Sequence, residues 1–258
     1  MDKYDIILDG VSGADMGLLF PSPLELSAPE PRVITESVPG RNGDVHIFDG
    51  SYKNRTAYLR GCLYQGFVNE AFDVFNEWLF AKPGYLRLET PAEEGKFLMA
   101  RVVNGSNVLN RANKVAPVEI KFDCKPQRFL KVGEISRTVY NTDLGTNPFY
   151  NITKYSSKPL IKINYTTRTG AGYIYIDNGN DYETVNTVKV DTLKLANYGS
   201  SVFYDAEIDV LYNDYRGGTY YDGIISYDRD VILSPGDNHI VLDGDIDSVE
   251  ITPRWWVL

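Results

Sequence analysis

The side chains in this sequence that could do chemistry are two histidines, two cysteines and many carboxylates. His46 lies in a strand-like stretch and His239 follows an asparagine, and neither belongs to a metal-binding pair such as HExxH. Cys62 and Cys124 lie far apart and outside any CxxC motif, so the usual zinc sites and a disulfide framework are not indicated. We therefore interpret the histidines as structural or solvent-facing and the cysteines as buried thiols in strands, and we expect no metal and no cofactor.

The carboxylates are the remaining candidates for catalysis, because a glycosidase needs only two of them at a suitable separation. The densest run is Asp243, Asp245 and Asp247. Alternate residues of a strand share one face, whereas in a turn the same side chains point into solvent. Gly244 favours the turn, so we expect a solvated loop.

Motifs of nucleophilic and nucleotide-dependent enzymes are missing from the sequence, which has no GxSxG elbow, no Walker loop and no GxGxxG segment before a helix. The run from 177 to 183 is rich in Asp and Asn, but Tyr182 stands where a calcium loop requires glycine. We expect a plain hairpin turn there. These patterns predict that the protein is not an enzyme.

A tyrosine-rich tract near residue 215 is a candidate contact surface. Exposed tyrosines among Gly, Asn and Asp offer flat apolar faces beside hydrogen-bonding groups, which suits sugar rings and protein interfaces alike. A hairpin whose tyrosines cover a sheet is the third interpretation. The candidates for a partner or saccharide contact are Tyr212, Tyr215, Tyr220 and Tyr221.

The overall charge of the chain makes anionic partners unfavourable. The chain has 258 residues with 26 Lys plus Arg against 35 Asp plus Glu, a net charge of −9. This sign disfavours specific nucleic-acid binding and membrane-surface binding. No apolar window is long enough to span a membrane, and the charged start of the chain does not resemble a secretion signal.

The composition changes near residue 130, which predicts a domain of residues 1–130 and a domain of residues 131–258. The first part has 5 tyrosines and the second has 14. The second part contains seven short β-branched or aromatic runs separated by turn-forming pairs, with no helical period between them. This pattern predicts an all-β sandwich.

The first part contains one convincing helix among strand-like stretches. Its apolar residues recur at i, i+3, i+4, i+7 and i+8, and we expect Asn69 as the N-cap and Pro83-Gly84 as the end. The predicted apolar stripe consists of Ala71, Val74, Phe75, Trp78 and Leu79. The fold class predicted is therefore mainly β with one amphipathic helix.

A long hairpin is predicted from Val33 to Phe48. A Pro39-Gly40 pair and an Asn42-Gly43 pair, both strong turn formers, separate two strand-like stretches.

Seven segments, taken together and in order, resemble the distal tail protein (Dit) family of long, non-contractile-tailed bacteriophages. In the first part they are YDIILDG from Tyr4, VPGRNGD from Val38, GSYKNRT from Gly50 and FDCKP from Phe122. In the second part they are SKPLIKI from Ser157, LSPGDNHI from Leu233 and ITPRWW from Ile251. The set covers most of the chain.

The resemblance implies an N-terminal ring-forming domain that assembles as a homohexamer, and a C-terminal galectin-like β-sandwich. It implies a virion protein at the distal end of the tail, a hub between the tail tube and the tail-tip or baseplate proteins. The implied partners are the major tail (tube) protein, the tail-associated lysin or tail-tip hub protein, and receptor-binding or other baseplate proteins.

On this hypothesis the protein works by assembly. Long hairpins offer unpaired edges to neighbouring subunits, so we expect the hairpin tip to reach a neighbouring subunit or a ring face. The candidate interface residues are Pro39, Gly40, Arg41, Asn42 and Gly43. Arg41 is either a charged donor to the partner or a solvated turn residue. The alternatives are a tail adhesin that binds host-surface saccharides and a cell-wall glycosidase.

Overall fold

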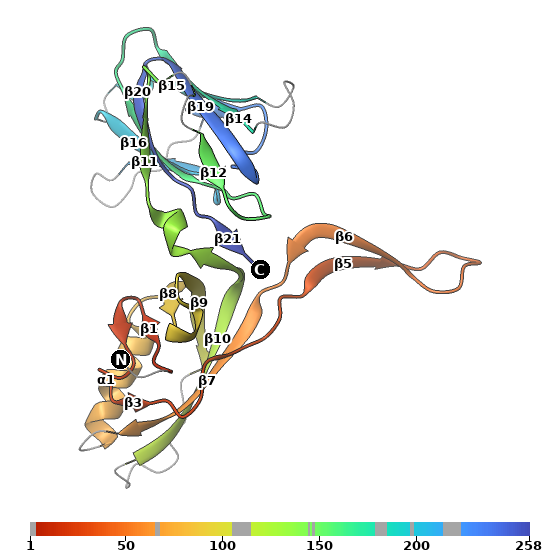
Figure 1. Ribbon diagram of the computed structural model, residues 1–258, viewed down its shortest axis with the longest axis vertical. Coiled ribbons are helices and arrows are strands. Elements are labelled where there is room, and N and C mark those ends of the chain that lie inside the picture. The colour runs from red at the N-terminus through yellow and green to blue at the C-terminus, as the bar shows by residue number, and fades with distance from the viewer. Residues whose placement is uncertain are drawn as a thin grey trace. The chain divides into compact units, whose positions relative to one another are not determined.

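The computed structural model describes residues 4–64, 68–104, 115–143, 145, 148–178, 185–196, 199–213 and 223–258. The chain divides into two compact units, which are residues 1–128 with 258 (unit 1) and residues 129–257 (unit 2). As predicted, the fold is mainly β with one α-helix in the described residues (Figure 1). No helix in the described residues is long and apolar enough to cross a membrane.

The sheet of unit 1 is antiparallel, and its strands follow the order β2-β1-β8-β9-β10-β7-β3, with β4 also paired to β7. Two short 3-10 helices, η1 (Pro91–Glu93) and η2 (Lys131–Glu134), follow β8 and β10 along the chain. The strands are β1 (Ile7–Leu8), β2 (Val11–Ser12), β3 (Leu18–Leu19), β4 (Glu25–Leu26), β7 (Arg55–Tyr64), β8 (Leu86–Glu89), β9 (Lys96–Asn104) and β10 (Val115–Leu130).

The long pair β7 and β10 forms the centre of this sheet. The two strands run antiparallel from Tyr64 opposite Val115 to Arg55 opposite Cys124. Side chains alternate strictly along β7, so that every second residue from Arg55 to Leu63 is buried. Because successive residues of a strand point to opposite faces, this alternation gives the sheet one face in the core and one face in water.

The helix α1 (Val68–Phe80) covers the buried face of β7 with a narrower apolar stripe than predicted. Phe75 and Leu79 are completely buried, and Phe72 and Trp78 pack against the same core. Val74, predicted in the stripe, is 52% exposed. It lies about 100° around the helix axis from Phe75, on the side away from Phe72.

The predicted N-cap was also wrong, because α1 begins at Val68 and Asn69 therefore lies inside the helix. At the other end the helix stops at Phe80, before Pro83 and Gly84, and Gly84 has φ +98°. A positive φ suits glycine because it has no Cβ, so the predicted stop signal is confirmed.

The predicted hairpin is confirmed. Strands β5 (Pro31–Glu36) and β6 (Val45–Tyr52) form a two-stranded sheet of their own (Figure 1). Their register places Val33 opposite Phe48 and Glu36 opposite Val45. Gly40 and Gly43 adopt φ values of +83° and +82° in the connecting turn, a conformation in which other residues are strained.

Unit 2 consists of two five-stranded antiparallel sheets, as the all-β prediction requires. The first follows the order β11 (Arg137–Tyr140), β20 (Ile246–Thr252), β13 (Leu160–Tyr165), β16 (Ser201–Asp205) and β17 (Val210–Tyr212). The second follows the order β12 (Phe149–Asn151), β19 (Gly236–Gly244), β14 (Ala171–Asp177), β15 (Asn186–Asp191) and β18 (Ile225–Tyr227). A last short strand is β21 (Trp256–Val257).

One apolar core joins the inner faces of these two sheets. Ile161 and Ile163 of β13 belong to the same buried cluster as Ile174 and Ile176 of β14, and all four are fully buried. Alternate residues of both strands face water. Two sheets that share one core in this way form a β-sandwich.

Candidate functional site

The two histidines are held by single polar neighbours. The ring nitrogen Nδ1 of His46 lies 3.1 Å from the Thr35 hydroxyl on the hairpin, and Nδ1 of His239 lies 2.7 Å from the carbonyl oxygen of Gly145. No group of three or more His, Cys, Asp or Glu side chains that could hold a metal ion occurs in the described part of the chain. Each ring therefore has a polar partner within the protein, and a structural or solvent-facing role for the two histidines stays a prediction.

The two cysteines differ from each other. Cys124 on β10 is fully buried, and this burial raises the pKa of its thiol to about 12. Cys62 on β7 belongs to the outward set and is only half-buried, so the prediction of a buried thiol was wrong for this residue. Its strand was predicted correctly, but which face it occupies depends on the register of the whole strand.

The aspartate run near residue 245 is not a solvated loop. Asp243 and Asp247 are exposed, but Asp245 is buried, which corrects the sequence prediction for that residue. Its carboxylate accepts hydrogen bonds from three backbone N–H groups and two hydroxyls. The donors are the N–H groups of Arg168, Thr169 and Gly170 and the hydroxyls of Thr169 and Thr192.

These bonds decide the charge of Asp245. Burial by itself raises the pKa of a carboxyl group, but the bonds from Thr192 and from the backbone outweigh it and hold the pKa of Asp245 well below its usual range. The carboxylate therefore ties the turn after β13 to the β19–β20 connection. The central member of the run therefore has a structural role.

Of the four candidate tyrosines, Tyr212 lies in β17, whereas Tyr215, Tyr220 and Tyr221 lie outside the described residues. The Tyr212 ring is half-buried and stacks on Phe203, with 5.5 Å between ring centroids and 15° between planes. The ammonium of Lys162 lies 5.5 Å from the centre of the Phe203 ring. These three side chains form one row on the outward face of the first sheet of unit 2.

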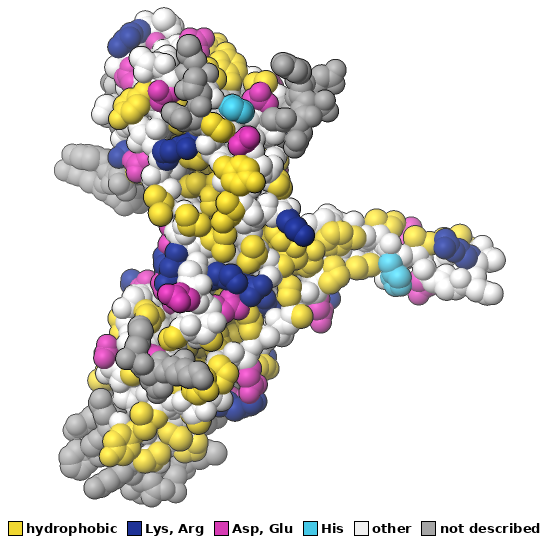
Figure 2. Space-filling model, viewed as in Figure 1, with side chains coloured by type: hydrophobic (Ala, Val, Ile, Leu, Met, Phe, Trp, Pro, Cys, Tyr) yellow, Lys and Arg dark blue, Asp and Glu magenta, His cyan; other side chains and the backbone are white. Residues whose placement is uncertain are grey.

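The hairpin formed by β5 and β6 is exposed along almost its whole length. Apart from Val45, every residue from 31 to 51 is exposed. Four large apolar side chains, which we call the hairpin surface, are about half exposed, and Figure 2 shows apolar side chains along this element. They are Val33 (43%), Ile34 (54%), Ile47 (46%) and Phe48 (50%).

The hairpin surface has two faces. Residues opposite each other in an antiparallel pair point to the same side, and the next pair points to the other side. Ile34 and Ile47 are partners and therefore share one face, while Val33 and Phe48 share the other. The hairpin thus presents an apolar cross-strand pair to water on both sides.

The predicted interface residues Pro39, Gly40, Arg41, Asn42 and Gly43 come together at the exposed tip of this hairpin. The backbone N–H of Arg41 donates to the carbonyl of Val38 at 3.1 Å, which closes the turn. The Arg41 side chain is exposed and has no ion-pair partner among the described residues.

The base of the hairpin is held by a local turn. The carboxylate of Asp49 accepts bonds from the hydroxyl and the backbone N–H of Ser51, both at 2.8 Å, and these bonds lower the pKa of Asp49. Gly50 between them has φ +86°. Close by, the ammonium of Lys53 lies 3.4 Å from Glu30.

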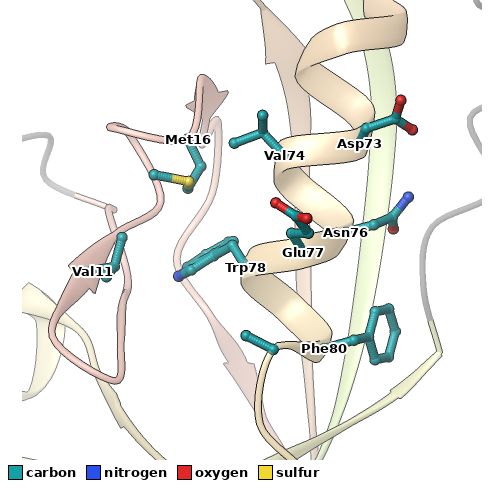
Figure 3. A pocket seen from close by; sticks show the side chains of 9 residues that line it. Val11, Met16, Asp73, Val74, Asn76, Glu77, Trp78 and Phe80 are labelled. Atoms are coloured by element: carbon teal, nitrogen blue, oxygen red, sulfur yellow. The ribbon is translucent and has the colours of Figure 1, made fainter.

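The structure contains a shallow groove of about 840 Å³ beside α1, which was not predicted from the sequence. Val74 and Trp78 point from the helix toward Met16 and Val11, and Glu77 lies on the open side (Figure 3). We call these five residues the α1 groove. The groove was not predicted because Val74 was interpreted as part of the buried apolar stripe of the helix. The sequence did contain one indication of an exposed apolar surface on this helix, because the apolar Phe80 falls outside the predicted stripe. In the structure Phe80 is exposed and lines the groove.

No protein-family model matches this sequence, and no curated protein matches it. Solved structures do match. The Dit (gp 19.1) protein of phage SPP1 covers 98% of this chain over 99% of its own length, at 15% identity and a TM-score of 0.65. Two structures of the phage p2 baseplate in its activated conformation, with Sr and with Ca, match at 11% and 10% identity, with TM-scores of 0.49 and 0.48. They cover 91% and 90% of this chain and 90% of their own chains. Over nearly its whole length, this chain has the fold of the SPP1 Dit protein.

Proposed function

We propose that this chain is a structural hub protein at the distal end of a phage tail, where it forms a closed homohexameric ring between the tail tube and the tail tip. The fold supports this role, because the SPP1 Dit protein is described as a paradigm of the hub adsorption apparatus in phages that infect Gram-positive bacteria. The proposed action is assembly rather than catalysis.

The observation that carries the proposal is the two-faced hairpin surface. An isolated two-stranded hairpin is at best marginally stable in water, and a natural one with apolar pairs on both faces needs a cover. Completing the burial of these four half-exposed side chains would contribute about 1 kcal/mol each, or about 4 kcal/mol for each subunit. The unpaired edges of β5 and β6 add backbone groups that a neighbouring strand can bind.

A ring follows from the kind of contact that such an arm makes. When an arm of one subunit docks on a different patch of the next, the contact is heterologous, and repeating it generates a ring if the rotation closes. The number six comes from the family resemblance. In this ring the tip residues Pro39 to Gly43 contact the neighbouring subunit or a ring face.

We further propose one partner on each side of the ring. The major tail (tube) protein docks on one face, and the tail-associated lysin or tail-tip hub protein docks on the other. Unit 2, the proposed galectin-like domain, contacts receptor-binding or other baseplate proteins, and the row of Tyr212, Phe203 and Lys162 is the candidate surface. Saccharide binding at this row is the competing outcome, which a glycan array would detect.

The native mass of the purified chain tests the ring directly. Light scattering coupled to size exclusion is expected to give six times the 29.1 kDa of one chain. A single-chain mass at every concentration, together with infectious tails assembled without the protein, would contradict the proposal.

A further inference from the structure

The outward face of the second sheet of unit 2 carries two tyrosine rings on its central strand. Tyr173 and Tyr175 are alternate residues of β14, so they point to the same side of the sheet, and both are half-buried. Their ring centres lie 6.1 Å apart, and the ring planes differ by 11°. The two rings therefore form one aromatic surface, which we call the tyrosine platform.

Oppositely charged residues lie on the two sides of the tyrosine platform. The register places Tyr173 between Asp243 of β19 and Lys189 of β15, and both charged residues are exposed. Since neighbouring strands lie about 4.8 Å apart, roughly 10 Å separates these two positions. Among the described residues, Lys189 has no ion-pair partner and Asp243 accepts a hydrogen bond only from the N–H of Gly244. Both groups are therefore available to a ligand that lies over Tyr173.

A loop covers one end of this face. Gly145 lies against Val241 and His239 of β19, and its carbonyl oxygen is 2.7 Å from Nδ1 of His239. On the open side, Thr187 and Ser226 add hydroxyl groups in the same cross-strand rows as the two tyrosines. The open part of the face is therefore the tyrosine platform with polar groups around it.

This combination of groups fits a saccharide. A sugar ring presents C–H groups on its faces, which pack on an aromatic ring, and hydroxyl groups at its edge, which both donate and accept hydrogen bonds. A carboxylate only accepts and an ammonium only donates, so Asp243 and Lys189 together complement such hydroxyls. Their separation of roughly 10 Å suits one sugar ring with its hydroxyl groups. The second tyrosine extends the platform for the next ring of a chain.

The charges of the face indicate a neutral saccharide. Four aspartates and one lysine point outward from the described strands of this sheet, and one of the aspartates pairs with Lys194 at 3.5 Å. The excess of negative charge repels sugars that carry phosphate, sulfate or carboxylate groups. The outward aspartates are Asp177, Asp191, Asp237 and Asp243, and the lysine is Lys189.

A protein partner fits this face less well. The centre of a protein–protein interface is depleted of Lys and Asp, whereas here both residue types lie directly beside Tyr173. Apart from tyrosines, the only apolar residues at the outward positions of the described strands of this sheet are Ala171 and Val241.

We propose that the tyrosine platform binds a neutral saccharide chain, with Asp243 and Lys189 bonded to the hydroxyl groups of the sugar ring that packs on Tyr173. This inference adds a ligand to the proposed hub. It does not depend on the ring of subunits, because every residue of the site belongs to unit 2 of one chain.

A glycan array probed with the full chain tests this binding. The array carries neutral hexasaccharides of glucose, galactose, rhamnose and N-acetylglucosamine, and hexagalacturonate as the anionic probe. The wild type is expected to bind at least one neutral hexasaccharide and not the anionic one. Calorimetric titration with the neutral hexasaccharide of strongest signal then gives the Kd.

Substitutions in the tyrosine platform should weaken this binding while the chain remains folded. Tyr173→Thr and Tyr175→Thr introduce a residue that is favoured in strands, and each should raise the Kd about tenfold because a ring contact is lost. Tyr173→Phe keeps the ring and should bind within about twofold of the wild type. The matched control is Tyr212→Thr, which removes a stacked ring from the first sheet and should leave the Kd unchanged. The melting temperature of each variant verifies folding.

The flanking charges are tested in the same titration. Asp243→Ala and Lys189→Ala should each raise the Kd about fivefold, as expected for the loss of one hydrogen bond. Asp237→Ala, at an exposed aspartate farther along β19, is the control and should bind like the wild type.

Three results would overturn the inference. They are a wild type that binds no neutral hexasaccharide, platform variants that bind as tightly as the wild type, and an equal loss in Tyr212→Thr, which would place the sugar on the first sheet. If the wild type binds no glycan and the platform variants fail to enter tails, the face contacts a protein instead. None of these results changes the native mass expected of the chain, so the ring is tested separately.

Discussion

Arg254 and Asp205 form a bidentate ion pair in unit 2, with Nη1 2.7 Å from Oδ1 and Nη2 2.9 Å from Oδ2. The backbone of Arg254 has φ +58°, a left-handed conformation that is strained for a residue with a side chain. Its N–H donates to the carbonyl of Gly133 at 2.7 Å. The ion pair and this bond together hold the segment between β20 and β21 in its strained conformation.

Removal of this pair is expected to destabilise unit 2. Burial raises the pKa of Asp205, but the bond and charge of Arg254 outweigh it and hold the pKa below its usual value. Asp205→Asn leaves the Arg254 guanidinium partly buried without its counter-charge, so the free energy of unfolding should fall by about 2–4 kcal/mol. Urea denaturation measures the change.

The control for this variant is Asp230→Asn. Asp230 pairs with Lys158 at 3.3 Å on the exposed surface, where a pair contributes less than about 1 kcal/mol. Equal losses in both variants would contradict the structural role of the Arg254 pair.

Asp245→Asn should destabilise unit 2 and change its pH dependence. An amide presents one oxygen and two N–H donors to five donor groups, so we expect a loss of about 2–4 kcal/mol at pH 7. Because the folded-state pKa of Asp245 lies below the unfolded value, its contribution is fully present above about pH 5 and falls as the pH decreases below about 4.

The difference between wild type and Asp245→Asn should therefore shrink as the pH falls, and denaturation series at several pH values measure it. Asp243→Asn is the matched control, because Asp243 is exposed. A difference that stays constant down to pH 2 would argue against a charged Asp245 in the folded state.

The double substitution Ile34→Thr with Ile47→Thr should weaken assembly of the ring without unfolding the subunit. Both residues are about half exposed and face each other across the hairpin, and threonine keeps a β-branched side chain while removing apolar surface. We expect the concentration for half-assembly to rise more than tenfold, as measured by light scattering, with the melting temperature of the subunit nearly unchanged. Leu193→Thr, on unit 2, should leave assembly intact.

Cys124 should resist alkylation in the folded protein. Its thiol is buried and its pKa is raised to about 12, so almost no reactive thiolate exists at pH 8. Iodoacetamide followed by mass spectrometry should label Cys124 only after unfolding in guanidinium chloride. Rapid labelling of native Cys124 would show that the core of unit 1 opens on the timescale of the reaction.

Local signals predicted much of the fold. The alternation in Leu160–Tyr165 is that of a half-buried strand, and the structure contains this strand as β13. The turn pairs around Gly40 and Gly43 predicted the hairpin, because few sequences favour two positive φ values so close together. In each case neighbouring residues carry the whole signal.

The tertiary structure decided the features that depend on distant neighbours. Asp245 is read as a loop residue from its adjacent glycine, but its donors come from Arg168 to Gly170 and from Thr192, more than fifty residues away along the chain. Val74 fits a helical period, yet the sheet contacts the helix through Phe75 and Leu79 and leaves Val74 exposed in a groove. Periodicity determines which residues share a face of an element, whereas the packing of one element against another determines how much of that face is buried.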